Sequence, residues 1–184
     1  SVALNGIGGN SDAANSALVG IGSVSSSGVV GADGTPQGIV TQTDLVRRNS
    51  NSLINMIADI NRRETYDGLA EVVARNPQML VELVASGLEG HQVGRMMTGI
   101  TDAVTRRLIA LAEQKLGPAP VPWLWLACGS QGRMEQTGVS DQDNCLFLSD
   151  DYDEDAHGGY FAEFARFVSD GLDAVGCFYC PGDM

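Results

Sequence analysis

The pattern of hydrophobic and polar residues divides the chain into three stretches of different periodicity. Residues 1–37 are rich in Gly, Ser, Ala and Asn and contain only short apolar stretches. Over residues 52–116 the apolar residues recur at i, i+3, i+4 and i+7, which is the spacing of amphipathic helices. After residue 122 the pattern alternates apolar runs of strand length with one further helix. The chain is therefore predicted to be an α+β protein with a helical bundle in its middle.

The first stretch predicts a β-hairpin. An Asp-Gly turn signal at residues 33–34 separates the apolar residues 29–30 from residues 38–40. A helix is expected to follow, beginning at Leu45 behind a polar capping residue.

The middle stretch predicts three or four helices joined by short links. A first apolar stripe covers residues 53–60, and a second ends at Asn76, which is expected to cap a helix with Pro77 in its first turn. The longest helix is expected over residues 91–116, with Gly117 as its stop. The inward-facing residues expected on the last two helices are Leu80, Leu83, Val84, Val93, Met97, Ile100, Val104, Leu108 and Leu111.

The last stretch predicts a mixed sheet with flanking helices. Residues 117–122 form a stiff, proline-rich connector and are the expected domain boundary. The run Trp123–Cys128 is continuously apolar, which predicts a strand that is buried on both faces. Further strands are expected at residues 143–148 and 175–179, with an amphipathic helix around residues 161–172 between them.

Composition narrows the class of protein. The 184 residues include 11 Lys and Arg against 23 Asp and Glu, a net charge of 11 − 23 = −12. Binding to nucleic acid or to an anionic membrane is therefore not expected, since either requires clustered basic residues. No apolar run approaches the ~20 residues that span a bilayer, and no signal peptide is visible. Four cysteines without a secretory signal fit a reducing compartment, so we expect a cytoplasmic protein.

Residues 129–144 contain the groups that could perform chemistry. Gly129 follows an expected strand, where a glycine allows a sharp turn and a close approach to a ligand, and Ser130 offers a hydroxyl for a phosphate. Asp141 and Asp143 are two residues apart, so their carboxylates project from the same face of an extended segment. Close carboxylates repel unless a cation lies between them, and such oxygen ligands suit Mg²⁺. This arrangement is typical of phosphoryl or nucleotidyl transfer.

A Gly-Ser pair, ten residues and Asp-x-Asp resemble the active-site signature of the DNA polymerase β-like nucleotidyltransferases. The whole segment, GSQGRMEQTGVSDQDN, most resembles the DUF294-type nucleotidyltransferase family, which is allied to PII-protein uridylyltransferases and to the glutamine-synthetase adenylyltransferase. The resemblance implies transfer of UMP or AMP from an NTP to a protein hydroxyl, such as that of a PII-like signalling protein, with Mg²⁺ or Mn²⁺ as cofactor. A homodimer is also compatible with it.

The resemblance also implies roles for individual residues. Asp141 and Asp143 would hold the metal and act in catalysis. Gly129, Ser130 and Arg133 would bind the phosphates of the nucleotide. The supporting residues would be Glu135, as the group that orients Arg133, and Ser140. Arg133 and Glu135 could instead form only a surface ion pair.

Residues 38–45 resemble the end of a CBS motif. Such motifs occur in pairs, and a pair binds adenine nucleotides. Thr41 and Asp44 match its positions that contact phosphate and ribose. The expected division is a partial CBS domain at 1–48, a helical bundle at 49–117 and the N-terminal portion of a nucleotidyltransferase domain at 118–184. The alternative function is a non-catalytic regulatory protein that senses adenine nucleotides.

The superfamily usually has a third carboxylate on a later strand. Asp183, which follows the strand expected at residues 175–179, lies near the position where this carboxylate would be expected. Because the chain stops there, we expect a fragment of a longer polypeptide that is inactive by itself. Cys177 and Cys180 form a C-x-x-C pair without a second pair, so the sequence assigns them no zinc or redox role.

Overall fold

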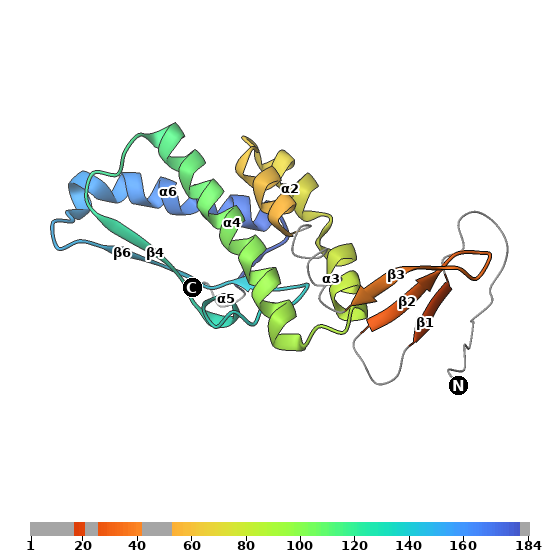
Figure 1. The fold of residues 1–184 in the computed structure, drawn as a ribbon. Helices are drawn as coiled ribbons and strands as arrows, with labels where there is room; N and C mark the ends of the chain where they lie inside the picture. Colours follow the sequence, from red (N-terminus) through yellow and green to blue (C-terminus); the bar gives the residue numbers. More distant parts are fainter. Residues whose placement is uncertain (1–16, 21–25, 42–52, 181–184) are drawn as a thin grey trace. The chain divides into compact units, whose positions relative to one another are not determined.

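The computed structural model describes residues 17–20, 26–41 and 53–180 (Figure 1). The chain forms two compact units, Ser1–Asn51 and Ser52–Met184. The first contains a small sheet, and the second combines helices with short strands. The α+β class predicted from the sequence is therefore confirmed.

In the first unit the described residues form a three-stranded antiparallel sheet. Its strands are β1 (Ala17–Gly20), β2 (Ser26–Val30) and β3 (Pro36–Thr41), in the order β1-β2-β3. The turn between β2 and β3 has Gly34 at φ 79°, which favours glycine, and Thr35 donates to the Asp33 carboxylate. The predicted hairpin is confirmed. The helix expected from Leu45 lies outside the described residues.

The second unit begins with the helical bundle. Residues 53–61 are helical and are followed by α2 (Tyr66–Val73), α3 (Asn76–Ala85) and α4 (Gly90–Leu116). All six residues predicted to face inward on α4 are buried. Gly117 ends α4 with φ 86°, as its predicted role as a helix stop requires.

Two predictions about α3 are wrong in detail. Asn76 is the first helical residue, and the capping position is Arg75, whose own backbone is already helical, so no side chain caps this helix. Val84 is 60% exposed, whereas Met79 and Leu83 are buried. Met79 and Leu83 are four residues apart and share the core face of α3, so the residue after Leu83 is rotated about 100° toward solvent.

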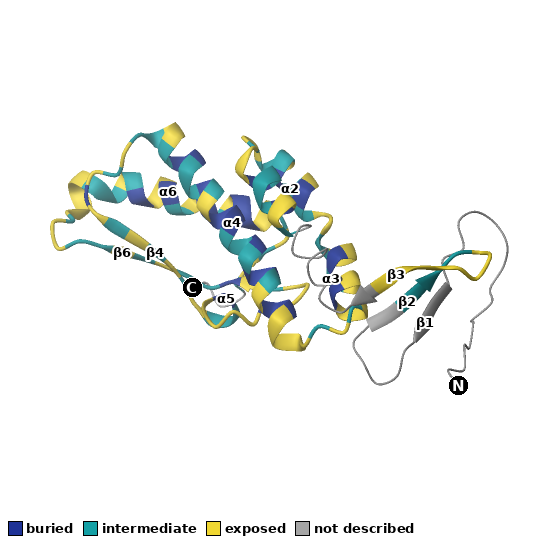
Figure 2. Cartoon of the chain, viewed as in Figure 1, coloured by how far each residue is buried: buried dark blue, intermediate teal, exposed yellow. Residues whose placement is uncertain are grey.

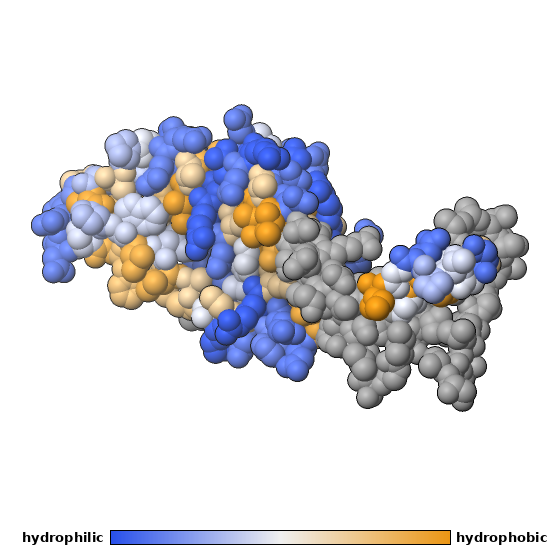
Figure 3. Space-filling view, viewed as in Figure 1, coloured by the Kyte–Doolittle hydropathy of each residue, from blue (hydrophilic) through white to orange (hydrophobic). Residues whose placement is uncertain are grey.

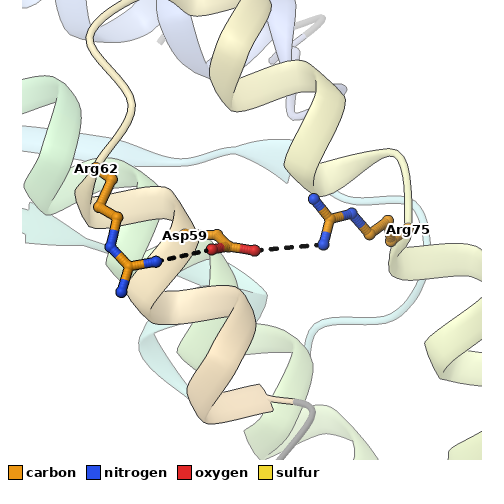
Figure 4. Close-up of polar contacts among 3 residues, drawn as sticks. All are labelled: Asp59, Arg62 and Arg75. Carbon is orange, nitrogen blue, oxygen red and sulfur yellow. Dashed lines mark hydrogen bonds and ion pairs between the residues drawn. The ribbon is translucent and has the colours of Figure 1, made fainter.

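An ion-pair bridge links the first helix of this unit to the start of α3 (Figure 4). The Asp59 carboxylate accepts from Arg62 Nη1 at 3.2 Å and from Arg75 Nη1 at 3.4 Å. The two guanidinium groups are more than half exposed, so the bridge adds little to the free energy of unfolding. Its effect is to orient Arg75 at the junction between α2 and α3.

After α4 come short strands and two helices. In chain order they are β4 (Trp123–Ala127), α5 (Gly129–Gly132), β5 (Asp141–Gln142), β6 (Asn144–Leu148), α6 (Glu154–Ala174) and β7 (Phe178–Tyr179). They pair as two separate two-stranded sheets: β4 runs antiparallel to β6, and β5 runs parallel to β7. The strand predicted at 143–148 is β6, which begins one residue later than predicted. Asp143 lies between β5 and β6, where the chain changes from one sheet to the other.

The prediction that the strand at 123–128 is buried on both faces is wrong. Trp123 and Trp125 pack against Phe164 of α6, with ring centroids 4.8 and 6.4 Å apart, but Leu124 is 55% exposed on the opposite face. Phe147 of β6 is exposed on that same outer side. Figure 3 shows the resulting apolar area over the β4–β6 sheet. Helices cover only one face of this sheet, so an apolar run does not imply burial here.

The helices and the later elements share one hydrophobic core. Figure 2 shows its buried residues along α2, α4 and α6, and α4 packs directly against α6. The predicted boundary at residue 117 therefore falls inside the second compact unit. The boundary predicted at residue 48 lies among residues that are not described. None of the helices described is both long and apolar enough to cross a membrane.

The packing of α6 generates a stability prediction. Phe164 is fully buried between the two tryptophans of β4, whereas Phe147 is 59% exposed. Phe164→Ala should lower the free energy of unfolding by about 3–5 kcal/mol, because it removes a buried ring and leaves a cavity. Phe147→Ala, the same chemical change on the exposed face, should cost less than about 1 kcal/mol. Urea denaturation of both variants measures the difference, and equal losses would contradict the packing described.

Candidate functional site

The bend after β4 brings the backbone into direct contact with an acidic side chain. Gly129 has φ 50°, and a Cβ built on it would lie 1.9 Å from Asp143 Oδ2. Any other residue would collide with the carboxylate at this distance, quite apart from the strain of the positive φ. Glycine is thus required here for two reasons: the backbone has a positive φ, and a side chain would overlap the Asp143 carboxylate.

Backbone hydrogen bonds hold Asp143 over this bend. Ala127 pairs with Asn144 at the end of the β4–β6 ladder, and the Cys128 N–H donates to the Asp143 carbonyl at 2.7 Å. Trp125 Nε1 also donates to Asn144 Oδ1 at 3.1 Å. Asp143 is therefore fixed by its neighbours on both strands at the point where the chain passes from β5 to β6.

The two predicted aspartates lie on one face of the chain. Gln142, between them, is buried, and its amide Nε2 donates to the carbonyls of Ser169 and Cys177, both at 3.0 Å. Because side chains alternate along an extended segment, Asp141 and Asp143 both project away from that core side. A carboxylate oxygen of each lies within 4.8 Å of the other.

A cysteine lies beside the two carboxylates. In the parallel pairing of β5 with β7, Asp141 is opposite Phe178 and Gln142 is opposite Tyr179. The next residue, Cys180, consequently lies alongside Asp143, and its Sγ is within 4.8 Å of both carboxylates. The sequence did not reveal this third group, since strand neighbours 37 residues apart along the chain carry no local pattern.

Ser130 lies in α5, a single helical turn anchored to the bundle. Gln131 Nε2 donates to Asp102 Oδ1 of α4 at 2.9 Å, and the Ser130 carbonyl accepts from the Glu135 N–H at 2.9 Å. Ser130 itself is half-buried, next to Gly129. The bend thus places Ser130 directly after the glycine whose backbone meets the Asp143 carboxylate.

Arg133 and Glu135 form an ion pair, with Arg133 Nε 2.9 Å from Glu135 Oε2 and both side chains 63% exposed. Met134, between them, has φ 57°, and the backbone here runs so close to α4 that a Cβ on Gly94 would lie 3.0 Å from the Met134 carbonyl. The pair orients the guanidinium at the surface. This agrees both with the phosphate clamp and with the simple surface pair considered above.

A pocket of about 430 Å³ lies next to the aspartates. Its lining includes Ser140, which directly precedes Asp141, and Phe178, which is paired with Asp141. Met97 and Ile100 of α4 provide apolar walls. Gln136, also part of the lining, is 3% exposed, and its Oε1 has no hydrogen-bond partner among the described residues. The predicted supporting residue Ser140 thus faces a largely apolar recess.

Comparison with protein families decides which group the chain belongs to. The family described as Putative nucleotidyltransferase DUF294 matches residues 74–184, more than half of the chain. The chain belongs to the DUF294 family. Comparisons with curated proteins and with solved structures gave no match. The DUF294 match extends from the end of α2 to the C-terminus, so it contains the bend, both aspartates and Cys180. It does not reach the predicted CBS segment and does not show a relation to PII uridylyltransferases.

The remaining predicted residues lie at the end of a described range or outside the described residues. Thr41 is the last residue of β3, and Asp44 lies outside the described residues. Asp183, near which a third carboxylate was expected, is also outside them. Their proposed roles stay predictions.

The donors present in this DUF294 domain fit a divalent cation. Asp141 and Asp143 supply carboxylate oxygens, the ligands that Mg²⁺ and Mn²⁺ prefer, within a span that one ion can bridge. Because Gly129 has no side chain, the space that a Cβ would fill is left to the Asp143 carboxylate. The arrangement can hold an ion at the surface, next to a serine and to an apolar pocket.

Two further cysteines of the DUF294 domain, 17 residues apart along the chain, are neighbours in space. The Sγ atoms of Cys128 and Cys145 are 3.5 Å apart across β4 and β6, and both side chains are exposed. Their hydrogen bond raises the pKa of the Cys128 thiol, with smaller contributions from burial and from the charges of Cys145 and Asp143.

The contact between Gly129 and Asp143 generates the second prediction. Gly129→Ala should lower the free energy of unfolding by about 1–3 kcal/mol through its positive φ, and should also displace the Asp143 carboxylate. Binding of Mn²⁺, followed by isothermal titration calorimetry, should weaken at least tenfold (about 1.4 kcal/mol).

Gly87→Ala is the matched control, because Gly87 has φ 78° and nothing within 4 Å of a built Cβ. It should lose similar stability but keep its affinity for Mn²⁺. If both variants bind the ion as tightly as the unchanged chain, the Gly129–Asp143 contact does not shape the site.

Proposed function

We propose that this chain carries the metal- and phosphate-binding part of a site that transfers a nucleoside monophosphate from an NTP to an acceptor hydroxyl. Membership of the DUF294 family supports nucleotidyltransferase activity in general. The observation that carries the proposal is the meeting of Asp141, Asp143 and the Gly129–Ser130 bend at one place on the surface. The components of phosphoryl-transfer chemistry, an acidic metal site and a phosphate-binding turn, are thereby adjacent.

Each residue has a distinct task in this proposal. Asp141 and Asp143 hold a divalent ion, Mg²⁺ or Mn²⁺, and Gly129 lets the triphosphate approach the backbone closely. Ser130 offers its hydroxyl to a phosphate oxygen, and Arg133, held by Glu135, offers a planar cation to another. The protein thus positions and neutralises a highly charged substrate, which is the main requirement of phosphoryl transfer.

When bound, a divalent ion supplies positive charge that offsets the charge of the triphosphate and of the reacting oxygens. The acceptor hydroxyl attacks the α-phosphorus in line, a new P–O bond forms, and the bond to the β-phosphate oxygen breaks to release pyrophosphate. The hydroxyl proton passes to solvent or to a neighbouring carboxylate. The chain contributes by fixing these groups before reaction occurs.

The pocket beside Ser140 is suited to the nucleoside. Its walls are mostly apolar, as a base requires, and it adjoins the aspartates through Phe178 and Ser140. We propose that it receives the base, UMP or AMP being the transferred group. The acceptor is proposed to be a protein hydroxyl, such as that of a PII-like signalling protein, in the cytoplasm. Homodimer formation belongs to the same proposal.

The third prediction tests transfer directly. The full-length protein should transfer label from α-labelled UTP or ATP to its acceptor, and Asp141→Asn or Asp143→Asn should lower the rate by about 100-fold or more. The loss should be at least this large, because replacing a residue that only hydrogen-bonds to a metal ligand already lowers metal affinity or activity by about 10- to 100-fold. Asp150→Asn, which removes the same charge from the exposed turn after β6, should leave the rate within about twofold, because its field is screened by solvent.

Transfer that is unaffected by either site substitution would contradict the assignment. Calorimetry with ATP, AMP and Mg²⁺ separates the alternative, a nucleotide sensor. Nucleotide binding without turnover, unchanged in Asp141→Asn and Asp143→Asn, would support the sensor and exclude the transferase.

A further inference from the structure

The pocket beside the aspartates has two buried hydrogen-bond acceptors in its wall that the described part of the protein does not use. Gln136 is 3% exposed, and its Oε1 has no partner in the part of the chain that the structure describes. Asn76, the first residue of α3, also lines the pocket, and its buried Oδ1 likewise has none there. A buried acceptor without a hydrogen bond costs free energy of folding, and natural structures contain few of them. Two beside one pocket indicate a ligand that donates hydrogen bonds.

Two hydroxyl groups of the same wall are already engaged within the protein. Thr101 Oγ1 donates to the Met97 carbonyl at 3.5 Å, and Thr137 Oγ1 donates to the Val139 carbonyl at 3.1 Å. Both threonines line the pocket. Because a hydroxyl has a single hydrogen, neither can donate to a ligand without giving up its present bond. The wall therefore favours N–H groups of a ligand over carbonyl oxygens.

The backbone next to Gln136 is fixed on both sides of the loop that carries it. The Glu135 N–H donates to the Ser130 carbonyl at 2.9 Å, which ties the loop to the bend after β4. The loop also runs so close to α4 that a Cβ on Gly94 would lie 3.3 Å from Glu135 Cα. Gln136 is thus positioned through its backbone, which leaves its Oε1 for a ligand.

An exposed aromatic ring adjoins the same pocket. Phe178 is 56% exposed, lines the pocket and is paired with Asp141. Aromatic side chains bind nucleobases by stacking, which depends little on which base is bound. Met97 and Ile100 supply further apolar surface. A flat ring that carries N–H donors suits both the apolar surface and the two acceptors, and a nucleobase has this chemistry.

The acceptors favour adenine over uracil. The adenine amino group has two hydrogens, so it can donate to Gln136 Oε1 and keep a second hydrogen for another acceptor, while the Gln136 amide nitrogen donates to a ring nitrogen. Uracil has one N–H between two carbonyl oxygens, and acceptors in the wall would repel these oxygens. Adenine also has the larger face for stacking on Phe178.

We propose that Gln136 recognises the amino group of adenine and that the pocket therefore selects ATP over UTP. The inference rests on the proposed function in placing the triphosphate at the aspartates, and it names the base that is transferred. Gln136 contacts the base and none of the reacting atoms, so it determines specificity and takes no part in the chemical step. Its Oε1 gains a hydrogen bond when adenine binds, which makes the missing bond of the free chain part of the recognition.

Nucleotide binding tests the inference without requiring transfer. Isothermal titration calorimetry of the 184-residue chain with Mg²⁺ compares ATP with purine riboside triphosphate, which differs from ATP only in lacking the amino group, and with UTP. The unchanged chain should bind ATP at least about tenfold more tightly than either of the others, because an acceptor stays unpaired in the site when the donor is missing.

Gln136→Met should abolish the preference for the amino group. The variant keeps a side chain of similar length without the amide, so ATP and purine riboside triphosphate should bind within about twofold of each other. Its resistance to urea should equal or exceed that of the unchanged chain, because the substitution removes a buried acceptor that has no partner among the described residues. A purely structural role for Gln136 would instead lower stability and leave the ratio of the two affinities unchanged.

Three further variants separate recognition from other effects. Phe178→Ala should weaken both purine nucleotides by the same factor, about fivefold or more, because stacking does not depend on the amino group. Asn76→Ala should reduce the preference for ATP over UTP by about threefold or more, because one acceptor is lost. Thr98→Val is the matched control: Thr98 is 1% exposed, and its Oγ1 also lacks a partner within the described ranges, but it lies outside the lining of the pocket. Its affinities should match those of the unchanged chain.

Equal affinities for ATP and either of the other nucleotides would overturn the inference, and so would the failure of ATP to bind. A preference for ATP that survives Gln136→Met, or that disappears in Thr98→Val, would place the adenine elsewhere, for example at the predicted CBS segment. These results are separable from those of the proposed function. Transfer by the full-length protein without Gln136-dependent selectivity refutes only the base assignment, whereas this selectivity without transfer refutes only the transferase.

Discussion

The arrangement of the site depends on one contact, that between the Gly129 backbone and the Asp143 carboxylate. A side chain at residue 129 would occupy the space that Asp143 Oδ2 takes, at 1.9 Å. The same glycine adopts the positive φ with which the chain leaves β4. Asp143, for its part, stands where the chain passes from the β5–β7 pair to the β4–β6 pair. One small residue therefore allows a tight turn and an acidic side chain to share a location.

The contact needs a framework, because two close carboxylates repel each other. The buried Gln142 amide provides part of it by tying the segment between the aspartates to α6 and to the residues before β7. The core supports this from below, where Phe164 packs against both tryptophans of β4. Stability is thus concentrated under the strands, and the acidic groups remain at the surface, where an ion and its substrate can reach them.

The sequence predicted well what depends on local pattern. The inward face of α4, its stop at Gly117 and the hairpin around Asp33 and Gly34 follow from periodicity and turn chemistry, and all are confirmed. It was less successful where long-range pairing decides the result. Leu124 is exposed because only one face of the β4–β6 sheet is covered, and Cys180 reaches the aspartates through a parallel pairing. The predicted roles of Thr41 and Asp44 remain predictions, because Asp44 and the residues around it are not among those that the structure describes.

The most direct test of the account is the location of a bound ion. Crystals of the chain soaked in Mn²⁺ and measured for anomalous scattering should show a peak about 2–3 Å from a carboxylate oxygen of Asp141 and from one of Asp143. A peak confined to the acidic turn at residues 150–155, or the two carboxylates turned apart with no shared ion, would contradict it.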